Sequence, residues 1–290
     1  MTPPVMRLGF SAWAMQERPV AEQIEIVRTT GYASITLVSG AALGLDALTA
    51  DAAERRRIRE RLDRAALELS AVTGHADPLA AEPARREASR TRIRATIDLA
   101  ADLAGPGGPP CVVTMGRGTP EQYAQERGAL ADAFGELAAH ARTRGVVIAL
   151  EPHVGQMIDR PERVAWLVEA VGSPHFRLNF DNSHFEVMGY DLADYLPQLL
   201  PFAVHTELKD QRGRFPTHEF LVPGEGEFDY ARYLGAMERA GYRGCITVEI
   251  SKMVQRRPGY EAREVAARSF RTLTDAAARA GVSLLTGRTT

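Results

Sequence analysis

The sequence predicts an α/β fold, a single (β/α)8 TIM barrel, on the basis of three observations. Eight short apolar runs alternate with longer amphipathic segments along the 290 residues. The runs are rich in β-branched residues and nearly continuous in apolar character, as in parallel strands covered by helices. Eight is also the number of units at which such a sheet closes into a barrel. An open doubly wound sheet is the alternative, but LGFSAWAMQ lacks a glycine-rich phosphate-binding fingerprint.

The eight apolar runs are the expected strands. Each is short, and most end in polar residues. They are MRLGFSAW (6–13), ASITLVSG (33–40), ELSAVTGH (68–75), CVVTMGRG (111–118), VVIALEPH (146–153), FRLNFDNSH (176–184), FAVHTELKD (202–210) and CITVEISK (245–252).

Helix start and stop signals punctuate the segments between the runs. Thr119-Pro120-Glu121 is an N-cap followed by proline in the first turn, and Gly145 ends that helix. The segment GPGGPP (105–110) is too short for a domain linker, so we expect one domain over residues 1–290. The expected helices are 19–30, 51–67, 84–104, 120–143, 160–170, 191–199, 228–240 and a last one at about 260–280 that packs on the barrel.

Composition excludes some classes of protein. The formal charge of −2 and the pI near 6.4 give no basic excess, which argues against a generic nucleic-acid or membrane-surface binder. Cys111 and Cys245 each open an apolar run and are expected to be buried. MTPPVMRLGF does not fit a signal peptide, and no apolar run approaches the length of a membrane span. We therefore expect a cytoplasmic protein.

Four consecutive strands end in a carboxylate. The fifth run ends in Glu151 and His153, the sixth in Asp181 and His184, the seventh in His205 and Glu207, and the eighth in Glu249. The active sites of such barrels lie at the carboxyl ends of the strands. Carboxylates that converge there repel one another unless a cation neutralises them. Mostly oxygen ligands favour Mn²⁺, with Mg²⁺, Co²⁺, Fe²⁺ and Zn²⁺ as alternatives.

These strand ends carry a family resemblance. VVIALEPH, LNFDNSHF, HTELKDQRG, VPGEGEFDY and GYRGCITVEI resemble, in that order, the xylose-isomerase-like TIM-barrel superfamily of sugar phosphate isomerases and epimerases. The resemblance implies metal ligands at Glu151, Asp181, a seventh-strand residue and Glu249, with His184 contacting the sugar. The second strand departs from the family, because Thr36 stands where a glutamate is usual.

The seventh strand also departs from the family pattern. The family typically has His-x-Lys-Asp, whereas this chain has Glu207-Leu208-Lys209-Asp210, with His205 two residues earlier. In a strand, His205 and Glu207 point to the same face about 6–7 Å apart. Motif register favours Glu207 as the ligand, while residue type and charge balance favour His205. The expectation is His205, with Glu207 as the competing ligand and Lys209 as a compensating charge.

Other polar or aromatic residues at the strand ends are candidate contacts for a substrate. His75 closes the third strand, His153 follows Glu151 by two residues, and Trp13 ends the first strand. Arg212 lies on the loop after the seventh strand and is expected to bind substrate hydroxyls or a phosphate. For each of these, an ordinary loop or packing role is the competing interpretation.

The resemblance implies a divalent-metal-dependent isomerase or epimerase acting on a sugar or keto-sugar. A carbonyl held by the metal would acidify the neighbouring C–H, and Glu151 and Glu249 would be the catalytic acid and base that pass through an enediolate. A lyase or dehydratase using the same site, like inosose dehydratase, is the alternative. An endonuclease IV-type nuclease is disfavoured, because it requires more histidine ligands and a basic groove. The expected partner is a small carbohydrate, without nucleic acid or membrane, and a homo-oligomer fits the family.

Overall fold

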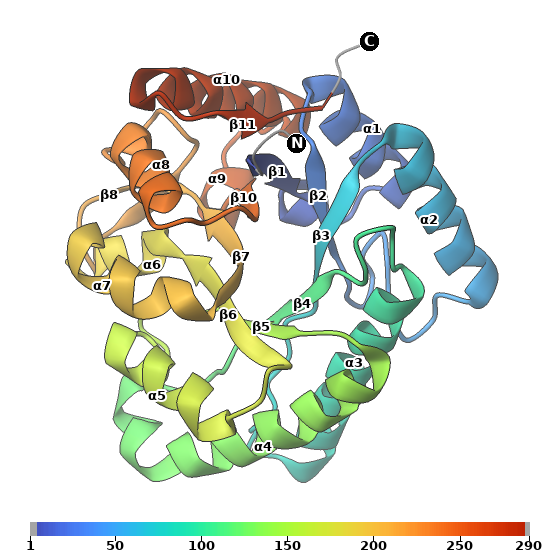
Figure 1. The fold of residues 1–290 in the computed structure, drawn as a ribbon. Helices are drawn as coiled ribbons and strands as arrows, with labels where there is room; N and C mark the ends of the chain where they lie inside the picture. Colours follow the sequence, from blue (N-terminus) through green and yellow to red (C-terminus); the bar gives the residue numbers. More distant parts are fainter. Residues whose placement is uncertain (1–4, 288–290) are drawn as a thin grey trace.

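A closed barrel of eight parallel strands forms the centre of the computed structural model, which describes residues 5–287 (Figure 1). Neighbouring strands pair in chain order, and the last strand pairs with the first, which closes the barrel. The predicted fold class is therefore confirmed. Residues 1–4 and 288–290 of the expected domain lie outside the described residues. The strands are β1 (Met6–Ser11), β2 (Ser34–Val38), β3 (Glu68–Thr73), β4 (Cys111–Thr114), β5 (Ile148–Leu150), β6 (Phe176–Asp181), β7 (Ala203–Leu208) and β10 (Cys245–Val248).

Helices surround the barrel and cover its outer surface (Figure 1). Several end where the sequence placed glycine: Gly31, Gly145 and Gly172 adopt left-handed conformations at helix C-termini, which glycine reaches without steric cost. Asp51 and Asp191 accept backbone N–H groups as N-caps. The main helices are α1 (Val20–Thr30), α2 (Ala52–Ala65), α3 (Pro83–Asp102), α4 (Tyr123–Arg144), α5 (Pro161–Val171), α7 (Leu192–Leu199), α8 (Tyr230–Arg239) and α10 (Ala262–Ala280).

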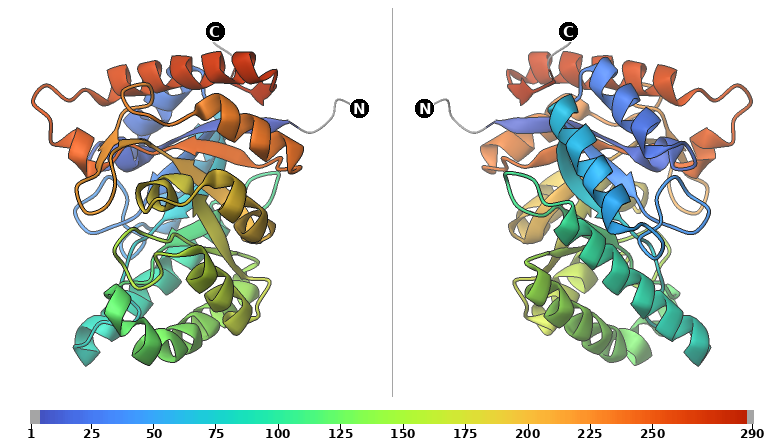
Figure 2. Two further views of the ribbon diagram at one scale, coloured as in Figure 1. Left: turned by 90° about the vertical axis from the view of Figure 1, so that its left-hand side faces the viewer. Right: turned by 90° about the vertical axis from the view of Figure 1, so that its right-hand side faces the viewer.

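Several short elements were not predicted, and many of them follow directly on barrel strands. Segments expected to extend the first and sixth strands instead turn into helices, and an antiparallel hairpin follows β7. In the left view of Figure 2, the orange hairpin and the short red-orange helix lie on the side away from the N-terminus. The additional elements are η1 (Ala12–Met15), η2 (Pro120–Gln122), α6 (Asn182–Val187), η3 (Leu200–Phe202), β8 (Asp210–Arg212), β9 (Glu219–Leu221), α9 (Lys252–Gln255) and β11 (Leu284–Leu285).

Apolar side chains fill the space between the strands and the helices. One large cluster includes Leu8, Phe134, Phe176 and Ile246, all fully buried, and runs around the whole barrel. Inside the barrel a small apolar layer of Ala71, Val113 and Ala149 is separate from this cluster. Among the described helices, none is both long enough and apolar enough to cross a membrane.

Candidate active site

The carboxyl ends of the strands bring acidic side chains to one level of the barrel. Glu207 is in register with Asp181 of β6 and with Thr247 of β10. Glu151 and Glu249 directly follow the strands: the Glu151 N–H donates to the Thr114 carbonyl at 2.7 Å. The Glu249 N–H donates to the Leu208 carbonyl at 2.9 Å, which fixes the backbone at that position.

The four carboxylates converge, as their places at the strand ends predicted. Glu151, Glu207 and Glu249 each offer an oxygen within 4.8 Å of the others. Glu151 and Asp181 also form such a group with a ring nitrogen of His184. The four acids are at most 7% exposed, so water screens their charges poorly. We call them, together with Lys209, the mouth cluster.

Lys209 supplies a positive charge inside the mouth cluster. Its ammonium donates to Asp181 Oδ2 and Glu249 Oε2, and it lies 5.5 Å from the centre of the Phe220 ring. The residue is 3% exposed. Burial alone would lower the pKa of Lys209, but Asp181, Glu249 and Glu151 raise it well above the usual lysine value. Lys209 is therefore a buried ammonium held by carboxylates.

The surroundings shift the pKa values of the three glutamates in different directions. Burial, reinforced by the charges of Glu151 and Glu249, raises the pKa of Glu207 well above its usual value. Burial also raises the pKa of Glu249, although Lys209 opposes the shift. Burial would raise the pKa of Glu151 too, but His153, His184 and His75 outweigh it and hold that pKa well below the ordinary value.

Three histidines surround Glu151. His153 Nε2 lies 3.0 Å from Glu151 Oε1, and His75 Nε2 lies 3.4 Å from Glu151 Oε2. The rings of His153 and His184 stack with centroids 4.4 Å apart, and Trp13 packs edge-on against His75 at 5.4 Å. Burial lowers the pKa of both His75 and His184 to about 4, so these two rings are neutral at pH 7. A neutral imidazole can accept a hydrogen bond from a substrate hydroxyl or bind a metal ion.

Unpartnered buried atoms gather at Glu151. Both carboxylate oxygens of Glu151, together with Nε2 of His153 and Nε2 of His184, are buried and form no hydrogen bond of good geometry, although histidine nitrogens lie 3.0 and 3.4 Å from the two oxygens. Buried polar atoms in native proteins are nearly always satisfied, so these atoms indicate a ligand. Oxygen-rich ligands around one point are the set that hard divalent cations prefer. The residues present therefore fit a divalent metal ion.

His205 lies one layer below the mouth cluster. It is in register with Asn179 on β6, and its Nδ1 lies 3.0 Å from Asn179 Oδ1. On the other side of the ring, Nε2 lies 3.2 Å from the hydroxyls of Ser70 and Thr247. We call these residues and Thr36, whose hydroxyl lies 3.4 Å from Nε2, the deep cluster. Both ring nitrogens are thus engaged, and this geometry runs against the expectation that His205 is the seventh-strand ligand.

Glu207 lies at the level of Asp181, in the mouth cluster. Its Oε2 accepts from Asn179 Nδ2 at 2.7 Å, so the Asn179 amide links the two layers. Sequence reasoning missed Asn179, because an asparagine inside the apolar run FRLNFD carries no motif of its own. It also missed Phe220, whose ring lies 5.1 Å from that of His184, because the hairpin that carries it was expected to be a loop.

The remaining predicted contacts separate into two groups. His75, His153, His184 and Trp13 lie around Glu151, as described above. Arg212 does not join them: it is exposed on β8, and its guanidinium donates to the Glu225 carbonyl at 2.7 Å. The expectation that Arg212 binds substrate therefore finds no support in this geometry.

Asp210 holds the loop that follows the hairpin. Its carboxylate accepts from the N–H groups of Gly224 at 2.8 Å and Phe228 at 3.1 Å. A Cβ at Gly226 would lie 2.3 Å from Asp210 Oδ1 and 2.4 Å from the Gln211 carbonyl, so this close approach requires glycine. The aspartate of the Lys-Asp pair thus has a structural role, while the lysine enters the mouth cluster.

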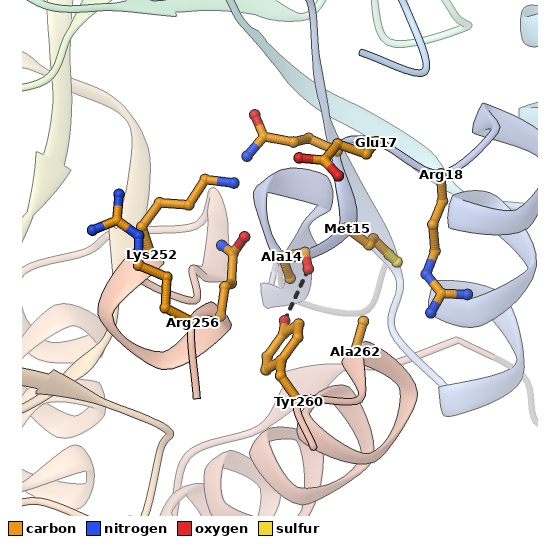
Figure 3. A pocket seen from close by; sticks show the side chains of 10 residues that line it. Ala14, Met15, Glu17, Arg18, Lys252, Arg256, Tyr260 and Ala262 are labelled. Carbon is orange, nitrogen blue, oxygen red and sulfur yellow. Dashed lines mark hydrogen bonds between the residues drawn. The ribbon is translucent and has the colours of Figure 1, made fainter. Parts of the chain in front are cut away.

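A pocket of about 430 Å³ is lined by residues that follow β1 and β10 (Figure 3). Lys252, which lines this pocket, lies 5.6 Å from the centre of the Trp13 ring, and the same ring packs against His75. In Figure 3 the Lys252 side chain extends toward Glu17, and Tyr260 donates to the Ala14 carbonyl at 2.9 Å. Apolar residues and side chains of both charge signs line the pocket.

Comparisons with known proteins agree with this architecture. The family model described as "Xylose isomerase-like TIM barrel" matches residues 24–260. An inosose dehydratase of Clostridium perfringens is 24% identical over 135 residues, which cover 41% of this chain and 46% of that protein. A putative hydroxypyruvate isomerase of Homo sapiens is 30% identical over 92 residues, or 32% of this chain and 31% of that protein. The matched part thus spans less than half the length of these curated relatives.

Solved structures share the fold over nearly the whole chain. The apo form of the 3-keto-D-glucoside 4-epimerase YcjR from E. coli superposes with a TM-score of 0.74 at 16% identity, covering 93% of this chain and 99% of that one. At this identity the likeness establishes the fold alone. The family model covers most of the chain, including the fifth to the eighth barrel strands and their acidic ends. The chain therefore belongs to the xylose isomerase-like TIM barrel family.

Proposed function

We propose that this protein is a divalent-metal-dependent isomerase or epimerase that acts on a sugar or keto-sugar. One observation carries the proposal: buried carboxylates from four consecutive barrel strands meet around Glu151, which forms one possible metal-binding group with Glu207 and Glu249 and another with Asp181 and His184. Such a group is costly to bury for stability alone, because like charges repel strongly in a poorly solvated site. A function that requires a bound cation explains the cost.

The proposed ligands are Glu151, Asp181, Glu207 and Glu249. Glu207 replaces His205 in this set, because the His205 ring is engaged in the deep cluster. Mn²⁺ is the leading candidate, with Mg²⁺, Co²⁺, Fe²⁺ and Zn²⁺ as alternatives. When bound, the ion would stabilise negative charge that develops on the substrate oxygens.

Glu151 and Glu249 are the proposed acid and base. They extend from different strands, β5 and β10, so they can approach a substrate carbon from two directions. One carboxylate removes the proton next to the carbonyl, and the other returns a proton. Asn179 and Lys209 keep the neighbouring carboxylates in place through hydrogen bonds.

Around Glu151, His184, His153 and His75 are proposed to hold substrate hydroxyls, and Trp13 to form the wall beside the sugar ring. The rings are already packed against one another, at centroid distances of 4.4 Å for His153–His184 and 5.8 Å for His75–His153. Preordered side chains lose little freedom on binding.

Replacement of Glu249 by glutamine tests this assignment. We expect the variant to lose the exchange of substrate hydrogen for solvent deuterium in candidate keto-sugars, assayed with Mn²⁺ by NMR. The matched control is Glu60→Gln, which makes the same change at an exposed position of α2. Exchange at the wild-type rate in the Glu249→Gln protein would rule out Glu249 as the acid or base.

A lyase is the second candidate, and the similarity to inosose dehydratase favours it. The same proton abstraction leads to elimination when the substrate carries a leaving group on the next carbon. Product analysis separates the two reactions, because elimination yields an alkene or a diketone together with water or the leaving group. An isomerase or epimerase conserves the mass of its substrate.

A further inference from the structure

The buried position of Lys209 calls for an explanation beyond packing. Lysine ammonium groups usually reach water, yet this one is 3% exposed and lies against the Phe220 ring. Among residues 5–287, it is the one lysine or arginine with a side-chain nitrogen within 4.0 Å of a carboxylate of the mouth cluster. Of the nearby histidines, His75 and His184 are neutral at pH 7, and His153 lies against Glu151 rather than against the acids that Lys209 contacts.

The glutamate on the seventh strand, Glu207, explains why a positive charge is needed here. An imidazole at that position would leave three acids in the shell, whereas Glu207 makes four. Glu207 has one amide donor, Asn179, and no cation of its own within 4.0 Å among the described side chains. A four-acid shell carries more negative charge than one divalent ion neutralises, and Lys209 supplies the nearest additional positive charge.

We propose that Lys209 is the internal counter-ion of the metal centre. Its positive charge offsets the negative charge that Glu207 adds to the shell, and it limits how tightly the site binds a cation. This inference rests on the proposed metal-dependent function. Lys209 and a bound cation would compete for the same oxygens. Asp181 Oδ1 already accepts hydrogen bonds from the N–H and the hydroxyl of Ser183. The other oxygen, Oδ2, accepts from the Lys209 ammonium. Lys209 also holds Glu249 Oε2, so an ion and the ammonium share the same two acids.

Two consequences distinguish this role from a merely structural one. Removing the ammonium removes repulsion between two cations in a poorly screened site, so cation affinity rises. The same change leaves the buried carboxylates of Asp181 and Glu249 without their cation, so the metal-free protein becomes less stable. A lysine that only filled space would alter stability without tightening metal binding.

The experiment is a Mn²⁺ titration of the full-length protein followed by electron paramagnetic resonance, with thermal melting of the metal-free form. We expect Lys209→Met to bind Mn²⁺ roughly tenfold more tightly or better, and to melt at a lower temperature without metal. Lys209→Arg, which keeps the charge, is expected to stay within about threefold of wild type in affinity. Arg61→Met, at an exposed position of α2, is the control for loss of one positive charge.

The double variant tests the pairing with Glu207. Adding Glu207→Gln to Lys209→Met removes one acid, so the metal-free melting temperature should recover toward wild type and the affinity gain should shrink. Circular dichroism checks the fold, and Lys209→Gln replaces Lys209→Met if the latter does not fold. Unchanged or weaker Mn²⁺ binding by the folded Lys209 variants overturns this inference alone. Failure of the wild-type protein to bind Mn²⁺ at all overturns the proposed function as well.

Discussion

His205 and Glu207 lie on one face of β7, two residues apart, and belong to two different chemical environments. In the deep cluster, the His205 ring has partners at both nitrogens: Asn179 on one side, and Ser70 and Thr247 on the other. In the mouth cluster, the two buried oxygens of Glu151 form no hydrogen bond of good geometry, and one ammonium, that of Lys209, is shared between Asp181 and Glu249. The deep layer is complete within the protein, while the mouth layer requires something more.

This difference separates stability from function along a single strand. A satisfied buried network contributes to stability and fixes one arrangement of the core. A buried group of like charges with orphaned oxygens costs stability, and proteins keep such groups where binding or catalysis uses them. Changes in the deep layer should therefore alter unfolding without altering metal binding. Changes in the mouth layer should alter metal binding and turnover, and removal of the Lys209 charge should alter unfolding as well.

The largest expected effect is on turnover. Glu151→Gln removes a proposed acid or base and the carboxylate around which three histidines gather. We expect kcat to fall by roughly a thousandfold, as is typical when an acid–base group is lost, with a free energy of unfolding close to that of wild type. Steady-state kinetics with the keto-sugar that shows deuterium exchange, beside Glu60→Gln as control, makes the comparison. Activity within tenfold of wild type would remove Glu151 from the mechanism.

In the deep layer, His205→Leu should act on stability instead. It leaves the Asn179 carbonyl oxygen and the hydroxyls around Nε2 with fewer partners inside the barrel. We expect a loss of about 3 kcal/mol in the free energy of unfolding, since each orphaned buried polar group costs about 1–3 kcal/mol. Urea unfolding of the metal-free protein measures it. A loss below about 0.5 kcal/mol, the range of a neutral surface change, would contradict the role given to the deep cluster.

Acid should weaken the folded state through the deep layer. Burial lowers the pKa of His205 to about 4, below its ordinary value of 6.5. Between these values the unfolded chain binds the proton and the folded one does not, so stability is full above pH 6.5 and is lost as the pH falls toward 4. The slope for one such histidine is about 1.4 kcal/mol per pH unit. Urea midpoints of wild type and His205→Gln at pH 7 and pH 5 should differ in this slope; parallel profiles would contradict the buried neutral state.

The smallest effects belong to the rim of the site. Lys252 lines the pocket of Figure 3 and lies 5.6 Å from the centre of the Trp13 ring, and it has no ion pair with the acids of the mouth cluster among the described residues. Lys252→Ala should raise KM by up to about fivefold without changing kcat, because a partly exposed charge contributes less than about 1 kcal/mol. Arg212→Ala should change neither constant, since its guanidinium binds the Glu225 backbone. A larger effect of Arg212 than of Lys252 on KM would reverse this order.

Much of this architecture could be predicted from the chain alone. Strand-end position was enough to bring Glu151, Asp181 and Glu249 together, because parallel strands of a barrel end at one mouth. The choice between His205 and Glu207 could not be predicted, because both point to the same side of β7. It depends on which level of β6 each one faces, and the register between β6 and β7 shifts between Leu178 and Asn179. A local irregularity of this kind leaves no signal in the periodicity of either strand.

The hairpin after β7 is a second feature that the sequence alone could not predict. Its strands are three residues each, and Phe220 comes near His184 and Lys209 only because the loop folds back over the mouth. Lys209 was foreseen as a compensating charge, but its contact with both Asp181 and Glu249 depends on three strands meeting in space. Pairings between distant strands follow from packing rather than from local sequence.

The count of bound Mn²⁺ in two variants of β7 tests the central claim most directly. Electron paramagnetic resonance of His205→Ala should show close to one tightly bound ion per chain, as in wild type, because the mouth cluster keeps its four acids. Glu207→Ala removes one of them and should bind Mn²⁺ at least about tenfold more weakly. The opposite result, in which His205→Ala loses the ion and Glu207→Ala keeps it, would contradict the account and return the ligand to the deep layer.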